Sequence, residues 1–171
     1  NTIVSVRDFS LSDSLHLPNT TFILSSSNDI SNIQLSTSAS KTISDAQLNA
    51  RVQTFTDGVK INFAPSSFIL NDKKWSLAKD GEITLRKSVI QANDVRFTQG
   101  TQEIIISTEK DDETGKANLV AKLKTVNIND FTSLILKQPR LEGTLTGILK
   151  LKDPFGSQII EFDAEAEDFR P

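Results

Sequence analysis

The stretch Leu-Glu-Gly-Thr-Leu-Thr-Gly-Ile-Leu-Lys-Leu, from Leu141 to Leu151, decides the fold of this chain. Leu and Gly stand at every second position, and the residues between them are mostly polar. A period of two is typical of a β-strand that has one buried face and one face in water. We therefore predict that this stretch is such a strand.

The same alternation recurs along most of the chain. Apolar residues of one parity are found at Leu48, Ala50 and Val52; Val59, Ile61 and Phe63; Ile83 and Leu85; Val95 and Phe97; Ile104 and Ile106; Leu119, Ala121 and Leu123; and Ile160, Phe162, Ala164 and Ala166. Long strands with one apolar face need either a second sheet or an apolar guest to cover that face.

The predicted fold class is all-β. We expect an elongated, curled antiparallel sheet that forms an open trough with an apolar interior, a β-taco, together with one short helix. The alternative is a β-sandwich, in which the apolar faces of two sheets cover each other. Both folds produce the same alternation, so the pattern does not separate them.

Composition sets further bounds. The chain has 171 residues and contains no Met, and we expect residues 1–171 to be a single β-rich segment of a larger protein. Its 19 basic residues are scattered and the formal net charge is -3, which argues against a nucleic-acid partner. The absence of Cys excludes disulfides, thiolate metal sites and cysteine nucleophiles.

Local signals predict where strands turn and where the helix lies. We expect turns at Thr56-Asp57-Gly58, with Gly58 at positive φ, and at Asp80-Gly81, which would close a hairpin. Helical spacing is confined to Asn129–Leu136, with Asn129 or Asp130 as the N-cap. Residues 1–45 are rich in Ser, Thr and Asn, and the alternative for this region is a partly mobile, low-complexity segment.

Side chains that could carry chemistry are few. His16 is the single histidine, and we interpret it as a surface or edge residue rather than a ligand or base. Asp111, Asp112 and Glu113 lack the spaced oxygen ligands of a calcium loop and are interpreted as a solvated turn. Trp75 is expected in the core rather than in a sugar site. We therefore expect no enzymatic activity, no catalytic residues, no metal and no cofactor.

Two stretches resemble a known family. The first is Asn71–Leu77 followed by Gly81–Leu85 and Val89–Phe97, and the second runs from Val126–Phe131 through Leu141–Gly147, where a helical segment precedes a "Leu-x-Gly-x-Leu-x-Gly" strand. Both are similar to the repeating region of TamB-like translocation and assembly module proteins of the Bacteroidetes type, within the AsmA-like group. The resemblance covers about half of the chain, from residue 70 to residue 152.

This resemblance implies a large protein of the Gram-negative envelope, anchored in the inner membrane and reaching through the periplasm. Such proteins are associated with phospholipid transport between the membranes and with outer-membrane protein assembly or secretion beside an Omp85-type barrel. The expected partners are therefore phospholipid acyl chains and, through other parts of the full-length protein, that barrel.

The expected groove lining follows from the parity of the strands. The residues that we predict to share one concave face are Ile61, Phe63, Ile83, Leu85, Val95, Phe97, Ile104, Ile106, Leu119, Leu123, Leu145, Leu149 and Phe162. The competing hypothesis for function is a surface β-sandwich that binds a glycan or a protein.

Overall fold

The computed structural model describes residues 2–12, 15–37, 43–135 and 141–170. Across these residues the chain is 76% strand, with one short helix, and the sheet is not closed into a barrel. The prediction of an all-β, curled and open antiparallel sheet is therefore confirmed. The strands are β1 (Thr2–Ser12), β2 (Leu15–Ser27), β3 (Ile30–Thr37), β4 (Ile43–Phe55), β5 (Gly58–Phe63), β6 (Ser66–Leu70), β7 (Lys73–Leu77), β8 (Glu82–Arg86), β9 (Val89–Asn93), β10 (Val95–Gln99), β11 (Gln102–Lys110), β12 (Ala117–Asn127), β13 (Glu142–Lys152) and β14 (Ile159–Arg170).

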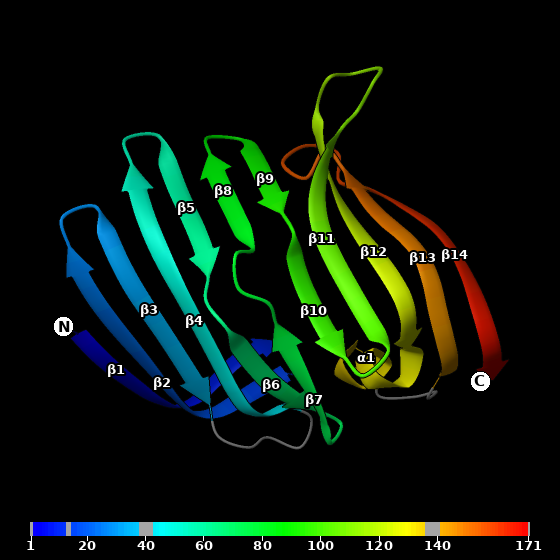
Figure 1. The fold of residues 1–171 in the computed structure, drawn as a ribbon, viewed down its shortest axis with the longest axis horizontal. Coiled ribbons are helices and arrows are strands. Elements are labelled where there is room, and N and C mark those ends of the chain that lie inside the picture. The colour runs from blue at the N-terminus through cyan, green and yellow to red at the C-terminus, as the bar shows by residue number, and fades with distance from the viewer. Residues whose placement is uncertain (1, 13–14, 38–42, 136–140, 171) are drawn as a thin grey trace.

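The described strands form one 14-stranded sheet with the plan of an antiparallel meander (Figure 1). Strands β1 to β4 are sequential neighbours, and so are β10 to β14. Between them, one half of β4 pairs with β5 and the other half with β6. Strand β5 then pairs with β8, and β6 with β7. The pairs β5 and β6, β7 and β8, and β9 and β10 thus behave as three long strands, each interrupted in the middle.

The interruptions lie side by side and are joined by backbone hydrogen bonds. The amide of Phe63 donates to the carbonyl of Gly81 at 2.8 Å, and the amide of Asp80 donates to the carbonyl of Phe63 at 3.1 Å. The predicted hairpin at Asp80-Gly81 is wrong, because β7 and β8 run in the same direction and pair with different strands. The chain bends here instead, with Asp80 at φ 72°.

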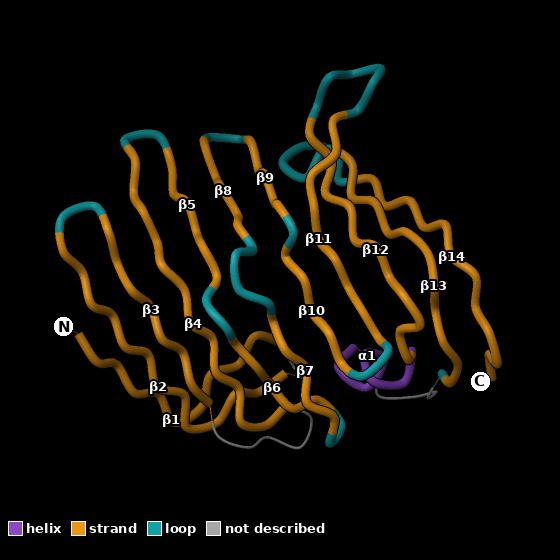
Figure 2. The backbone as a smooth tube through the Cα atoms, viewed as in Figure 1, coloured by secondary structure: helices purple, strands orange, loops and turns teal. Residues whose placement is uncertain are grey.

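Bulges let the apolar face continue through these irregular positions. Asp94, at φ 47°, is one extra residue between β9 and β10. Ala92 and Val95, three positions apart, therefore project from the same side of the sheet. Thr125, at φ 46°, has the same effect near the end of β12. Figure 2 shows the loop segments that separate the halves of the long strands.

Two glycines illustrate close backbone approach. Gly58 was expected at positive φ, but its φ is not positive. A Cβ at Gly58 would instead overlap the carbonyl oxygen of Leu85 on β8. A Cβ at Gly147 would overlap Asp163 and Ala164 on β14, so the backbones of β13 and β14 approach closely at this position.

The predicted helix is present as α1 (Ile128–Ile135), and Leu136 lies outside the described residues. The predicted cap is wrong by two or three positions. Asn127 precedes the helix, and its Oδ1 accepts a hydrogen bond from the amide of Asn129 at 3.0 Å. An Asn side chain at this position satisfies an amide that has no partner within the helix.

Helix α1 is held against the β6–β7 hairpin by a buried charge and an aromatic contact. Asp130 is only 2% exposed and accepts from Lys73 Nζ at 2.8 and 3.0 Å. Phe131 meets Trp75 edge to face, with ring centroids 5.3 Å apart. Trp75 is completely buried, as expected for a core residue, and it also stacks on Phe68. These contacts fix the helix at one end of the sheet (Figure 1).

Candidate functional site

The register of the strands places the predicted lining residues on one side of the sheet. Directly opposed residues in an antiparallel pair project from the same face. Cross-strand register partners connect the lining residues into rows that run across the sheet. These rows are Val59 with Leu85; Ile61 with Ile83 and Ala92; Val95 with Ile106, Ala121, Leu149 and Phe162; Phe97 with Ile104, Leu123 and Gly147; Val126 with Leu145; and Leu119 with Leu151. We call this side of the sheet the inner face and the other side the outer face.

Side-chain packing shows that the inner face is concave. A buried cluster of Leu77, Ala92 and Val95 lies at its centre. Leu48 of β4 and Leu119 of β12 both pack against this cluster, although β6, β7, β10 and β11 separate their strands in the sheet order. Side chains so far apart in the sheet meet only if it curls toward this face.

Accessibility differs along the inner face. Val95, predicted as groove lining, is only 2% exposed and belongs to the core, because Leu77, Ala92 and partly buried apolar side chains around them pack against it. The other predicted lining residues are partly exposed, and among those lining residues the ones on β13 and β14 include the most exposed. There, Leu149 is 37% exposed, Phe162 54% and Ile160 69%. Among the side chains that the structure describes, apolar surface open to a guest is therefore present at this end.

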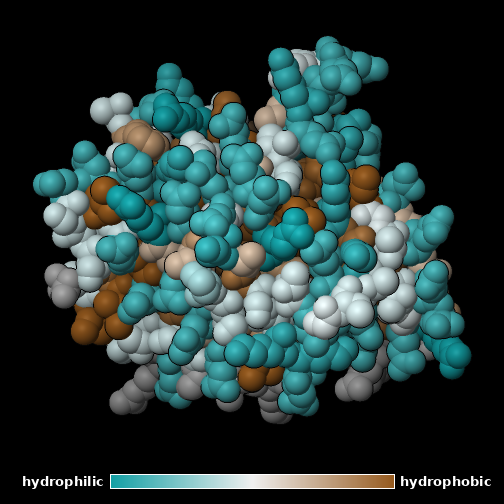
Figure 3. All heavy atoms as spheres, viewed as in Figure 1, coloured by the Kyte–Doolittle hydropathy of each residue, from teal (hydrophilic) through white to brown (hydrophobic). Residues whose placement is uncertain are grey.

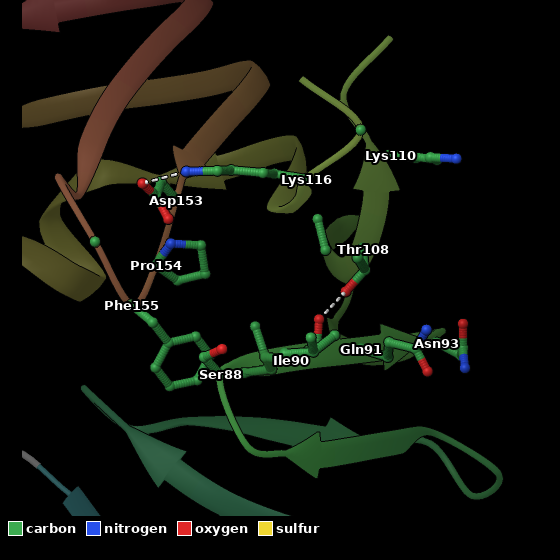
Figure 4. A pocket seen from close by; sticks show the side chains of 14 residues that line it. Ser88, Ile90, Gln91, Asn93, Thr108, Lys110, Lys116, Asp153, Pro154 and Phe155 are labelled. Atoms are coloured by element: carbon green, nitrogen blue, oxygen red, sulfur yellow. Dashed lines mark hydrogen bonds and ion pairs between the residues drawn. The ribbon is translucent and has the colours of Figure 1, made fainter. Parts of the chain in front are cut away.

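A cleft of about 800 Å³ opens beside β9. Thr108 Oγ1 of β11 accepts from the Ala92 amide at 2.8 Å and donates to the Ile90 carbonyl at 3.3 Å, so a side chain joins β9 to β11 where no backbone ladder forms. The loop between β13 and β14 forms the opposite wall of the cleft, and Figure 4 shows Phe155 reaching toward Ser88.

The rim of this cleft carries both apolar and charged side chains. Phe155 and Val89 are 53% and 46% exposed. Lys116 pairs with Asp153 at 3.0 Å, and this hydrogen bond lowers the pKa of the Asp153 carboxyl. Ile90 lines the cleft and, as the register partner of Leu85, also belongs to the inner face. The cleft is therefore a lateral opening onto that face.

The outer face is mainly polar, although Ile105, Val120 and Ile148 also project from it, and it carries ion pairs between neighbouring strands. Lys60 pairs with Glu82 at 3.0 Å and lowers the pKa of that carboxyl. Arg96 pairs with Glu103 at 2.8 Å. Hydrophilic side chains also dominate the view in Figure 3, where apolar ones show in patches between them. The contrast between the two faces is the property that the period of two predicts.

The structure places the other candidate residues as follows. Asp111 Oδ1 accepts from the amides of Thr114 and Glu113, as in a turn closed by its own side chain. Hydrogen bonds from Thr114, then from Asn118 and Glu113, lower the pKa of Asp111 to about 2. No group of three metal-ligating side chains is found among the described residues. His16 lies in β2, and its side chain is outside what the structure describes.

Sequence reasoning missed the cleft and the strand β1. The cleft depends on Thr108, whose hydroxyl replaces a backbone ladder, and no local pattern marks that role. Strand β1 has apolar residues at both parities, Ile3 next to Val4, so it lacks the alternation used elsewhere.

No protein-family model matches this chain, and no curated protein or solved structure matches it. Within the described residues, no helix is long and apolar enough to cross a membrane.

Proposed function

We propose that the inner face holds phospholipid acyl chains, and that this chain is a non-enzymatic section of a periplasmic, TamB-like or AsmA-like envelope protein. In this proposal it provides an apolar groove for phospholipid transport between inner and outer membranes, for outer-membrane protein assembly, or for both. Contact with an Omp85-type barrel would involve other parts of the full-length protein.

The supporting observation is an apolar concave face that its own fold leaves uncovered at one end. Leu149, Ile160 and Phe162 remain exposed on the inner face of β13 and β14. The β-sandwich alternative requires a second sheet that covers these side chains. All described strands belong to one sheet, so no such second sheet is formed by them. A guest of apolar chains is the simplest way to cover such a surface.

The burial of apolar surface alone can hold a lipid on the inner face, without any specific polar contact. Burying one methylene group stabilises a complex by about 0.8 kcal/mol. A few methylenes of one acyl chain against the inner face therefore contribute several kcal/mol. The cleft beside β9, whose wall includes Phe155 and Val89, would let a chain enter from the side.

Native mass spectrometry of the protein, purified from an envelope fraction and released gently from detergent, tests this proposal. We expect adducts with the masses of phospholipids, lost when Phe162→Glu and Leu149→Asp are combined. The matched control combines Ile148→Asp with Ile105→Glu, two apolar positions on the outer face, so that the charge changes equally. Adduct-free wild-type protein, or equal adducts in both variants, would contradict the proposal.

A further inference from the structure

The sheet contains a split between β9 and β11 that lies well inside the chain. Among the described strands β9 pairs with β8 alone, and the pairing of β10 with β11 ends at Ile106. Thr108 bridges the split, because its hydroxyl binds the Ala92 amide and the Ile90 carbonyl. An added peptide strand would need these same two backbone groups of β9. The cleft at this split therefore suits an occupant other than a strand.

One wall of the cleft is an apolar loop that its own bonds hold in place. The Asp153 carbonyl accepts from the Gly156 amide at 2.9 Å, and a Cβ at Gly156 would overlap the Asp153 carboxylate. The loop thus presents Pro154 and Phe155 to the cleft, with Phe155 53% exposed. Ile90 continues this apolar lining onto the inner face. At about 800 Å³, the cleft is in the size range of small-molecule sites.

The mouth of the cleft also carries one cation and one anion side by side. Lys116 Nζ lies 3.0 Å from Asp153 Oδ2, and the two side chains are 60% and 31% exposed. Figure 4 shows this pair next to Pro154, with the Lys110 side chain pointing away from it. An ion pair this exposed contributes little to stability. Its two groups can therefore bind the charges of a ligand instead of each other.

These features together define the chemistry of a ligand. An apolar chain would lie along Phe155 and Ile90 toward the inner face. A phosphate would accept hydrogen bonds from Lys116, and an ammonium would donate to Asp153. A headgroup with a phosphate alone would satisfy Lys116 but leave Asp153 without a cation.

We propose that this cleft binds the headgroup of a phospholipid that carries both a phosphate and a primary ammonium, as phosphatidylethanolamine does. Lys116 and Asp153 hold the headgroup, and the acyl chains pass Ile90 onto the inner face. This selectivity rests on the proposed function, because acyl chains on the inner face would supply most of the affinity.

Titration of two fluorescent lipids tests the selectivity. Phosphatidylethanolamine and phosphatidylglycerol with the same labelled acyl chain differ only in the headgroup, and only the first has an ammonium. We expect the purified protein to bind phosphatidylethanolamine about fivefold more tightly, which is the size of one partly exposed ion pair. Glycerophosphoethanolamine, which lacks acyl chains, should displace neither lipid at millimolar concentration.

Two variants separate the roles of the two charges. Asp153→Asn should weaken binding of phosphatidylethanolamine about fivefold and should not weaken binding of phosphatidylglycerol. Lys116→Gln should weaken binding of both lipids, because both carry a phosphate. The outer face supplies matched controls, since Lys122 and Glu109 form an ion pair that is also about half exposed. Lys122→Gln and Glu109→Gln should change neither affinity.

Equal affinity of the unmodified protein for the two lipids would overturn the headgroup selectivity and leave the proposed function standing. An equal loss of both lipids in Asp153→Asn would do the same, because it would mean that Asp153 only shapes the loop. Displacement by glycerophosphoethanolamine would assign the cleft to a soluble ligand instead of a lipid. Binding of neither lipid would overturn the selectivity and the proposed function together.

Discussion

Replacing Leu149 by Asp places a carboxylate on the inner face of β13, whereas replacing its neighbour Ile148 places the same group on the outer face. The two side chains are almost equally exposed, 37% for Leu149 and 39% for Ile148. Both are large and aliphatic, and both lie in the middle of the same strand. The pair therefore separates the effect of the face from the effects of size, exposure and position.

The magnitude follows from what a bound acyl chain would cover. Burying a whole Leu side chain contributes about 1.5 to 3 kcal/mol, so covering the exposed third of Leu149 contributes about 1 kcal/mol. A polar group buried without a hydrogen-bond partner costs about 2 kcal/mol or more. We expect Leu149→Asp to weaken lipid binding by about 3 kcal/mol, which is more than a hundredfold in Kd.

A phospholipid with a fluorescent acyl chain, titrated into each purified variant, measures this difference. Ile148→Asp should bind within about twofold of the unmodified protein, since no acyl chain passes over the outer face. Urea unfolding should show similar stability for the two variants. Equal loss of lipid binding in both, with the fold intact, would refute the assignment of the inner face as the lipid surface.

Three further predictions concern the fold that supports this surface. Gly147→Val should lower the free energy of unfolding by about 2 kcal/mol or more in urea titrations, because the new side chain overlaps Ala164, and an unchanged stability would disprove that close approach. Asp111→Asn should remove the contribution of this carboxylate to the pH dependence of the folding stability. The pKa of Asp111 falls from 3.8 to about 2 on folding, so the ionised carboxylate stabilises the fold fully above pH 3.8, and this stabilisation is lost as the pH falls through 2. Melting temperatures of the two proteins should therefore differ above pH 3.8 and converge toward pH 2, and a constant difference would contradict this. Lys73→Met should remove the ion pair between Lys73 and the buried Asp130 carboxylate and speed amide exchange in α1 selectively, whereas exchange that rises evenly across the sheet would count against a local tether.

The alternation of apolar and polar residues predicted most of the sheet, and it failed at identifiable places. The alternation within a strand assigns side chains to the correct face of the sheet only as far as the next bulge. Asp94 and Thr125 add a residue at positive φ without a glycine to mark the position, so the shift of parity there has no local signal. Asn127, which caps the helix, is of a residue type that favours capping. Asn129 and Asp130, which follow it closely, favour capping too, so residue type alone does not identify the cap.

Curvature is the property that the sequence pattern leaves open. It depends on how the three interrupted strands align, and their alignment rests on backbone bonds such as the one from the Asp80 amide to the Phe63 carbonyl. It also depends on the small Ala92 at the centre, which lets Leu77 and Val95 approach. These contacts are between residues distant in the chain, so a strand-by-strand reading predicts an apolar face but not which part of it stays exposed.

Photocrosslinking at Ile104 and Ile105 tests the central claim most directly. These identical, adjacent side chains lie on opposite faces of β11, with Ile104 opposite Leu123 on the inner face and Ile105 opposite Lys122 on the outer face. Each is replaced in turn by a photoreactive benzoylphenylalanine, and the protein is irradiated with vesicles that contain an alkyne-labelled phospholipid. The account predicts strong labelling from position 104 and background labelling from position 105. Equal labelling from both positions, or none from position 104 in a folded protein, would contradict it.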